Sequence, residues 1–293
     1  MKITGSIFAA MLTPLDNREQ INLDAIAPLI NYILSKGVDG LYVGGSSGEG
    51  MLQSLQERSS VLQAVASHGV EQCTLIAHVG ATSTADAVAL AEVASANNYS
   101  AISAVPPFYY KHSFDAISAY YQAIAEVSDL PLIIYNIPAL SGNDMSTQNL
   151  LQLMQNSRIA GVKYTATDLF QFQQLRQQAP DKSFYFGTDE MFLSAAAIGT
   201  DGGIGSTYNL IGDVYVNIQK ALALGNIEEA KKLQCSANNL VQILLETGVL
   251  PGLKHALNFI GINVGPCRKP FNRPSAESIA KLESWIEQNL LIE

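Results

Sequence analysis

Residues 159–165 read IAGVKYT, and this stretch decides how the chain folds. Its apolar and β-branched residues are typical of a strand buried on both faces, as strands of parallel sheets are. One residue interrupts the apolar run, Lys163, and lysine is rarely fully buried without a specific reason. The stretch therefore predicts a buried parallel strand that carries a candidate functional lysine.

Short apolar runs of the same kind recur along the 293-residue chain, separated by segments with helical periodicity. The eight runs lie at residues 7–12, 40–43, 74–79, 101–105, 132–135, 159–164, 184–186 and 202–204. One strand and one helix repeat about every thirty residues, as a βαβ unit requires. Eight units close a (β/α)8 barrel, whereas an open doubly wound sheet usually has fewer. We therefore predict the α/β class and a (β/α)8 TIM barrel.

Polar residues and glycines mark the ends of the predicted helices. Asn22 is expected to cap a helix over residues 23–36, and Gly37 to end it. Ser54 and Glu57 have the spacing of a capping box, which predicts that a helix begins after Ser54.

The pattern changes after residue 206, because no further strand follows. Four helices are predicted there, over residues 211–224, 227–247, 250–259 and 276–289. No low-complexity linker separates them from the preceding part. We expect residues 1–210 to form the barrel core with the catalytic site. Residues 211–293 are expected to add the last barrel helix and a C-terminal helical extension, as one continuous structural unit.

Composition and charge disfavour several classes of protein. The chain has 17 Lys and Arg against 26 Asp and Glu, a formal charge of −9, so nucleic-acid binding is disfavoured. No run approaches the ~18 consecutive apolar residues of a membrane span, and residues 1–5 lack the features of a signal peptide. Three cysteines without CxxC spacing suit a reducing compartment. We expect a soluble, cytoplasmic protein with no membrane partner. Charged residues are only 15%, which suggests that part of the surface is buried against other copies.

Active sites of TIM barrels lie at the carboxyl ends of the strands, which makes Lys163 a candidate nucleophile. Alternation places Lys163 and Thr165 on the same face of their strand. If that face points inward, desolvation favours the neutral amine, which can form a Schiff base with a ketone. The alternatives are a lysine that extends out of the barrel or one that is paired with a carboxylate.

Two further segments supply polar groups at strand ends. Tyr135 ends the fifth strand, where its phenol could relay a proton, although a buried tyrosine can also serve packing alone. Residues 44–49 read GGSSGE after the second strand, and their backbone N–H groups with Ser46 and Ser47 could hold a carboxylate or a phosphate. The segment matches neither the P-loop nor the GxGxxG pattern, and it could also be an ordinary turn.

Residues after the seventh and eighth strands are also candidates. Asp189 and Glu190 could accept hydrogen bonds from a polyhydroxylated substrate, or could simply be acidic first-turn residues of a helix. Ser206 follows the last strand. The four histidines have no metal-ligand spacing, so we assign no metal.

These segments, taken in order, resemble the N-acetylneuraminate lyase / dihydrodipicolinate synthase family of class I aldolases. The resemblance runs from about Gly5 to the C-terminal helices, and it is carried by GGSSGE (44–49), YNIP (135–138), GVK (161–163) and GIGS (203–206). It implies a barrel with a Schiff-base lysine, a pyruvate-type substrate, no cofactor and, usually, a homotetramer.

Within this family, residues 135–142, 186–190 and 202–209 look like segments of its lyase branch. The resemblance implies that Lys163 forms the Schiff base, that Tyr135 transfers protons, and that Ser46 and Ser47 hold the substrate carboxylate, with Ser47 also relaying a proton. The branch usually has Thr where this chain has Ser47, so a methyl is lost while the hydroxyl is kept. The residues implied to contact the sugar chain are Thr165, Gly187, Asp189, Glu190 and Ser206. Tyr109 or Tyr110 resembles a family tyrosine that reaches a neighbouring subunit's site.

The implied reaction is reversible cleavage of N-acetylneuraminate to N-acetylmannosamine and pyruvate. One alternative is another pyruvate-dependent aldolase, acting on 2-keto-3-deoxygluconate or making dihydrodipicolinate. Dihydrodipicolinate synthases carry an arginine after the Tyr-Asn-x-Pro segment, whereas residues 139–142 read ALSG, without a cation. A second alternative is a barrel that binds sugar acids without catalysis.

Overall fold

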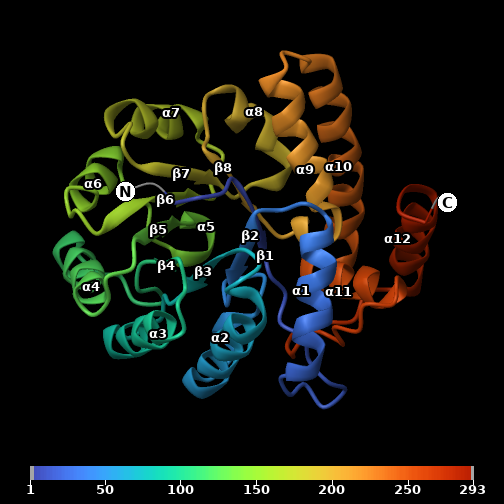
Figure 1. Cartoon of the computed structure of the whole chain (residues 1–293), viewed down its shortest axis with the longest axis horizontal. Helices are drawn as coiled ribbons and strands as arrows, with labels where there is room; N and C mark the ends of the chain where they lie inside the picture. The colour runs from blue at the N-terminus through green and yellow to red at the C-terminus, as the bar shows by residue number, and fades with distance from the viewer. Residues whose placement is uncertain (1–2, 292–293) are drawn as a thin grey trace.

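The computed structural model of the chain describes residues 3–291, which form a closed barrel of eight parallel strands (Figure 1). Each strand pairs with the next one along the chain, and the last pairs with the first. The strands are β1 (Ile7–Ala10), β2 (Gly40–Val43), β3 (Thr74–His78), β4 (Ala101–Ala104), β5 (Leu132–Asn136), β6 (Ile159–Tyr164), β7 (Ser183–Phe186) and β8 (Gly202–Gly205). All eight predicted strands are present within two residues of their expected ends, and the (β/α)8 prediction is confirmed.

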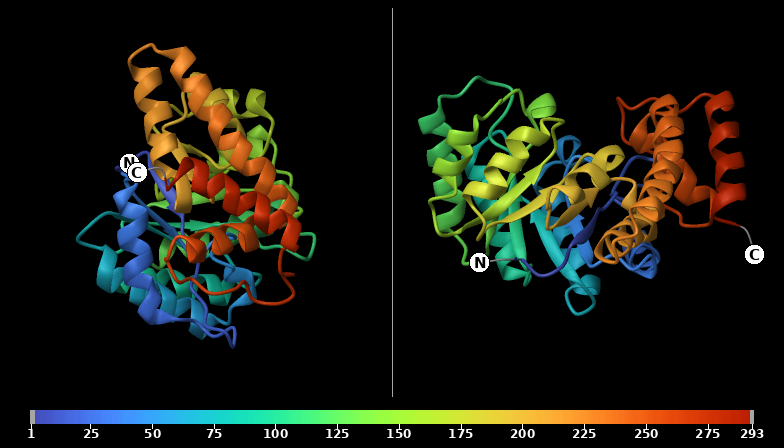
Figure 2. Two further views of the ribbon diagram at one scale, coloured as in Figure 1. Left: turned by 90° about the vertical axis from the view of Figure 1, so that its right-hand side faces the viewer. Right: turned by 90° about the horizontal axis from the view of Figure 1, so that it is seen from above.

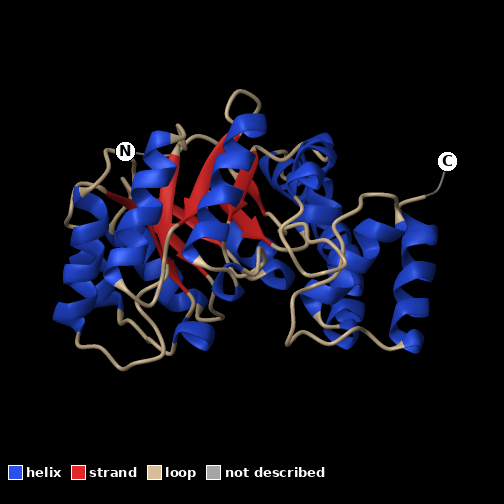
Figure 3. Ribbon diagram, turned by 90° about the horizontal axis from the view of Figure 1, so that it is seen from below, coloured by secondary structure: helices blue, strands red, loops and turns tan. Residues whose placement is uncertain are grey.

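Helices follow the strands and surround the barrel (Figure 3). They are α1 (Ile26–Ser35), α2 (Leu55–Gly69), α3 (Thr84–Ala96), α4 (Phe114–Glu126), α5 (Pro138–Ser141), α6 (Thr147–Leu153), α7 (Leu169–Gln178) and α8 (Phe192–Ala197). Short 3-10 turns lie at Leu23–Ala25, Gly50–Leu52 and Asp189–Met191.

The predicted helix ends are partly right. Ser54 and Glu57 form the reciprocal capping box that opens α2, and Gly37 adopts a φ of +75° just after α1. The predicted cap at Asn22 is wrong, because its side chain makes no capping hydrogen bond. A 3-10 turn intervenes, so α1 begins only at Ile26, beyond the reach of the Asn22 side chain.

Two apolar layers hold the fold together. Inside the barrel, a buried cluster includes Phe8, Tyr42, Ile133, Tyr135 and Tyr185. A larger cluster fills the space between the strands and the surrounding helices. Side chains that point inward therefore meet other strands' side chains, and inward residues at the carboxyl ends of the strands face the barrel mouth.

Four helices end the chain and lie to one side of the barrel (Figure 2). They are α9 (Tyr208–Ala223), α10 (Ile227–Thr247), α11 (Val249–Phe259) and α12 (Ala276–Asn289). The sequence predicted a start at residue 211, but α9 begins three residues earlier and is kinked at Ile211, whose φ is −125°. Between residues 3 and 291, no helix is long and apolar enough to cross a membrane.

Candidate active site

The register of the sheet brings Lys163 and Tyr135 together. They are partners between β5 and β6, and both side chains point into the barrel. The Lys163 side chain is buried, and its Nζ lies 4.0 Å from the centre of the Tyr135 ring and 4.1 Å from that of Tyr42. Lys163 does not extend out of the barrel; its amine is enclosed between two aromatic rings.

This enclosure determines the charge of the lysine. Burial lowers the pKa of Lys163 to about 7, although the nearby Asp189 carboxylate favours the charged form and opposes the shift. At neutral pH a large share of the molecules therefore carries a neutral amine. A neutral amine is the form that attacks a carbonyl carbon.

The pKa of Tyr135 also shifts on burial, but upward. Burial raises the pKa of its phenol, while the adjacent hydroxyls of Ser46 and Thr165 lower it in part. The phenol therefore holds its proton at neutral pH and lies beside two groups that can pass a proton on. This arrangement suits a proton relay next to the lysine.

The loop after β2 is closely packed and brings two hydroxyls to the barrel mouth. Gly44 has a φ of +76°, and a Cβ on Gly50 would lie 2.1 Å from the Gly44 carbonyl oxygen, so a side chain cannot fit there. Ser46 is half-buried and Ser47 is buried. The Ser47 Oγ lies 2.6 Å from the Oγ of Ser206, which joins this loop to the end of β8.

Asp189 is buried, although it also lies in the first turn of the 3-10 segment Asp189–Met191. Its Oδ2 accepts hydrogen bonds from the backbone N–H of Thr207 (2.9 Å) and from the Thr207 hydroxyl (2.7 Å). Burial raises the pKa of Asp189 to about 6. Within residues 3–291, its buried Oδ1 has no hydrogen-bond partner. A Cβ on Gly205 would lie 2.1 Å from this oxygen, so only glycine leaves room for the Asp189 carboxylate at the end of β8.

The remaining predicted sugar contacts lie around this carboxylate. A Cβ on Gly187 would lie 2.0 Å from the Thr165 Oγ1, so only glycine fits beside the threonine. The Thr165 hydroxyl oxygen is buried and lies beside the Tyr135 phenol. Glu190 is exposed at the rim, and its backbone carbonyl accepts a hydrogen bond from the Asn238 side chain.

Tyr109 and Tyr110 lie apart from these groups. Their side chains are 86% and 71% exposed, and their rings contact each other edge to face. Tyr109 has a φ of +77°, a left-handed conformation that is unusual for a bulky residue. Both rings are therefore turned to solvent in the single chain, next to Phe108, which lines the cavity described below.

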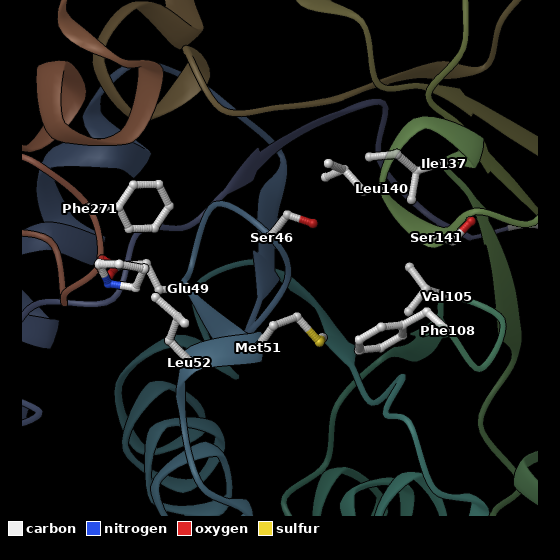
Figure 4. Close-up of a pocket in the computed structure, with 11 residues that line it drawn as sticks. Ser46, Glu49, Met51, Leu52, Val105, Phe108, Ile137, Leu140, Ser141 and Phe271 are labelled. Atoms are coloured by element: carbon white, nitrogen blue, oxygen red, sulfur yellow. The ribbon is translucent and has the colours of Figure 1, made fainter. Parts of the chain in front are cut away.

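A cavity of about 530 Å³ opens beside Ser46 (Figure 4). Its lining is mostly apolar and includes Met51, Phe108, Leu140 and Phe271. Lys163 does not line it; its amine lies deeper in the barrel, next to the rings of Tyr42 and Tyr135. The volume suits a small molecule, and Ser46 connects the cavity with the groups described above.

Sequence reasoning missed two aromatic residues of the site, Tyr42 and His78. The Tyr42 ring flanks the lysine, and its hydroxyl donates a 3.0 Å hydrogen bond to Ser103. His78 is buried and lies edge to face with Tyr135. Alternation along β2 could have shown that Tyr42 points inward, but nothing in the sequence places it next to Lys163. In the described part of the chain, no three His, Cys, Asp or Glu side chains could together hold a metal ion.

Comparison with known proteins agrees with the geometry. The N-acetylneuraminate lyase of Rhizobium meliloti is 44% identical over 286 residues, covering 98% of this chain and 95% of that protein. The CdNal protein of Clostridium difficile, solved in complex with mannosamine, is 36% identical with a TM-score of 0.95 over 97% of this chain and 99% of that one. The N-acetylneuraminate lyase of Fusobacterium nucleatum, solved with pyruvate, is 35% identical with a TM-score of 0.92 over 98% and 97%.

The dihydrodipicolinate synthetase family matches residues 3–289, which is nearly the whole chain. The resemblance found in the four short segments therefore extends over the full length of the barrel and the C-terminal helices. The chain belongs to the dihydrodipicolinate synthetase family.

Proposed function

We propose that this protein is an N-acetylneuraminate lyase, which cleaves its substrate reversibly to N-acetylmannosamine and pyruvate. The observation that carries the proposal is the buried Lys163, whose pKa is about 7 and whose amine faces the Tyr135 ring. The full-length similarity to N-acetylneuraminate lyases supports it.

The reaction begins with the neutral amine. Lys163 Nζ attacks the C2 ketone of the open-chain sugar acid, and loss of water leaves a protonated iminium. The iminium withdraws electrons from the C3–C4 bond, so the lysine itself supplies the electron sink. The faces of the Tyr42 and Tyr135 rings lie beside this nitrogen and offset part of the cost of burying the iminium charge.

Bond cleavage requires removal of the proton on the C4 hydroxyl. Tyr135 and Ser47 relay this proton from the C4 hydroxyl toward C3, and the C3–C4 bond breaks to release N-acetylmannosamine. The enamine that remains is protonated at C3, and water then hydrolyses the iminium to pyruvate and free Lys163. The Ser47–Ser206 hydroxyl pair lies 2.6 Å apart, which suits a chain of proton transfers.

Substrate binding divides into two regions. The hydroxyls of Ser46 and Ser47, with the N–H groups of their glycine-rich loop, hold the carboxylate next to the ketone. Thr165, Gly187, Asp189, Glu190 and Ser206 contact the hydroxyl-bearing chain of the sugar. The unpartnered Asp189 Oδ1 supports this division, because a buried acceptor without a donor is costly until a ligand satisfies it.

We also propose a cytoplasmic homotetramer. Its support is the low share of charged residues, 15%, and the exposure of the neighbouring rings of Tyr109 and Tyr110. Large exposed aromatic side chains are unfavourable in a monomer and are common at interfaces.

The alternative of a dihydrodipicolinate synthase has less support, because residues 139–142 carry no cation for a second substrate carboxylate. A pyruvate-release assay over a panel of 2-keto sugar acids tests the proposal. N-acetylneuraminate should give the highest kcat/KM. Three outcomes would contradict the proposal, and each supports one of the alternatives. They are a preference for 2-keto-3-deoxygluconate, condensation of pyruvate with aspartate semialdehyde, and binding of sugar acids without turnover.

A further inference from the structure

A buried ion pair connects the loop that carries Ser46 and Ser47 with the C-terminal helices. Glu49 ends this loop, and Lys254 lies on α11. The Lys254 Nζ is 2.6 Å from the Glu49 Oε1, and the two side chains are 1% and 2% exposed. Two charges are rarely placed so deeply without a role that repays their desolvation.

The remaining polar atoms of the pair bind the segment that follows α11. The second carboxylate oxygen of Glu49 accepts a 2.7 Å hydrogen bond from the backbone N–H of Arg268. The Lys254 ammonium donates a 2.9 Å hydrogen bond to the Pro266 carbonyl. Both side chains of the ion pair are therefore hydrogen-bonded to the backbone of residues 266–268.

Arg268 fastens the same segment to the residues just after the loop. Its guanidinium donates a 2.8 Å hydrogen bond to the Leu52 carbonyl and binds both carboxylate oxygens of Glu57, at 2.7 and 3.1 Å. It also reaches the carbonyl of Glu19 at 2.7 Å. The C-terminal segment thus fixes the chain on the far side of Glu49 as well.

Glu49 itself has a backbone conformation that needs outside support. Its φ and ψ are 56° and 28°, in the left-handed region that residues other than glycine rarely adopt. Its backbone N–H donates a 3.1 Å hydrogen bond to the Ser46 carbonyl, and the N–H of Gly50 binds Gly45 in the same way. Glu49 and Gly50 are thus bonded directly to the backbone of the loop that carries Ser46 and Ser47.

The same C-terminal segment also reaches the cavity beside the site. Pro270 and Phe271 line that cavity together with Ser46 and Glu49 (Figure 4). The helical extension is thus in contact with the ligand side of the barrel through both its charges and its apolar side chains.

We propose that Glu49 and Lys254 are positioning residues, through which the C-terminal extension fixes the loop that holds the substrate carboxylate. This inference rests on the proposed function. Neither residue touches the reacting atoms, so their loss should weaken substrate binding more than the chemical step.

The test compares Glu49→Gln, Lys254→Met and the double variant. Each single variant leaves one buried charge without its partner, which lowers Tm. We expect KM for N-acetylneuraminate to rise about 10-fold or more in both, while kcat stays within about 3-fold. The double variant removes both charges, so Tm should recover while KM stays raised. Recovery of KM together with Tm, or an unchanged KM in all three, would overturn the proposal.

A matched control is the Arg176–Asp201 ion pair, which joins α7 to the residue before β8 at the opposite end of the barrel. Arg176→Met should lower Tm and leave KM unchanged. Borohydride trapping of pyruvate gives a second readout, since half-saturation in the Glu49 and Lys254 variants should require about 10-fold more pyruvate. If the wild-type protein neither traps pyruvate nor cleaves the sugar acid, the proposed function is wrong. If the wild type is active and the variants keep the wild-type KM, only the positioning role of Glu49 and Lys254 is wrong.

Discussion

The amine nitrogen of Lys163 lies 4.0 Å from the centre of the Tyr135 ring, although the two residues are 28 positions apart. They meet because β5 and β6 pair with these two residues opposite each other. The register of the barrel, rather than a flexible loop, thus sets the distance between the nucleophile and the proposed proton relay. Because strand pairing holds the backbone at both positions, we expect a substitution at either one to change the side chain and leave the backbone in place.

Lys163 is expected to form the covalent intermediate. Incubation with pyruvate and borohydride should add one reduced pyruvyl group, which peptide mass spectrometry should locate on Lys163. The Lys163→Ala variant should remain unlabelled, because it lacks the buried amine that is proposed to form the Schiff base. Labelling at another lysine, or equal labelling of the variant, would refute the assignment.

The same lysine should make the protein less stable at low pH. Its pKa is about 7 in the folded state and 10.5 when unfolded, so the folded state carries the full cost of the charge below pH 7. This cost fades as pH rises from 7 toward 10.5, where both states are neutral. Lys163→Met should therefore raise the free energy of unfolding, by up to about 5 kcal/mol at pH 6 and by less at pH 9. Thermal unfolding at the two pH values should show the corresponding rise in Tm. A gain that is independent of pH would contradict this.

Tyr135→Phe should retain folding, because it removes one hydroxyl and little volume. Loss of a positioned acid or base typically costs about 10²–10⁴-fold in rate, and we expect the loss mainly in kcat. Tyr185→Phe is the matched control, and it should keep kcat. Tyr185 lies in the same barrel interior, but its hydroxyl donates a hydrogen bond to the Gly5 carbonyl. Steady-state kinetics of the two variants test whether the Tyr135 hydroxyl transfers protons. If Tyr135→Phe keeps nearly full kcat, Tyr135 serves packing only.

Assembly can be measured directly. Light scattering at micromolar concentration should give about four chains, with Tyr109 and Tyr110 covered by neighbouring copies. Their 86% and 71% exposure in the single chain is the physical reason. A stable and fully active monomer would rule out both the tetramer and a role for either tyrosine in another subunit's site.

The sequence was enough to predict the barrel, because buried parallel strands leave a clear composition and the helices between them have a different period. It was also enough to predict that Lys163 and Thr165 share a face, since alternation along a strand is strict. The cap at Asn22 failed because a 3-10 turn, which has no distinct periodicity, precedes the helix.

Contacts between distant segments could not be predicted. The Ser47–Ser206 pair and the Glu49–Lys254 pair join residues whose approach depends on barrel closure and on how the C-terminal helices pack. The sequence also allowed Asp189 to be a first-turn acid alone; it does lie in a first turn, but its burial and its contact with Thr207 depend on how the loops after β7 and β8 pack. Pairing across loops leaves no local pattern in a single sequence.

Specificity is expected to depend on Glu190, whose exposed carboxylate lies next to the buried Asp189 at the rim of the site. A carboxylate that accepts hydrogen bonds from hydroxyls is expected to contribute ~1.5–3 kcal/mol to binding, or roughly 10–150-fold in kcat/KM. Glu190→Gln should therefore reduce kcat/KM for N-acetylneuraminate by that factor. Pyruvate trapping at Lys163 should be unaffected, because pyruvate lacks the hydroxyl-bearing chain.

The matched control for this change is Glu287→Gln on α12, which removes an exposed carboxylate on the last helix, away from the barrel mouth. Kinetics with N-acetylneuraminate and with aspartate semialdehyde should be measured for the wild type and both variants. Residues 139–142 carry no guanidinium to pair with a second carboxylate, so wild-type condensation with aspartate semialdehyde should be negligible. An unchanged kcat/KM in Glu190→Gln would show that the sugar chain is held elsewhere. A wild-type preference for aspartate semialdehyde would show that another group in the site binds the second carboxylate.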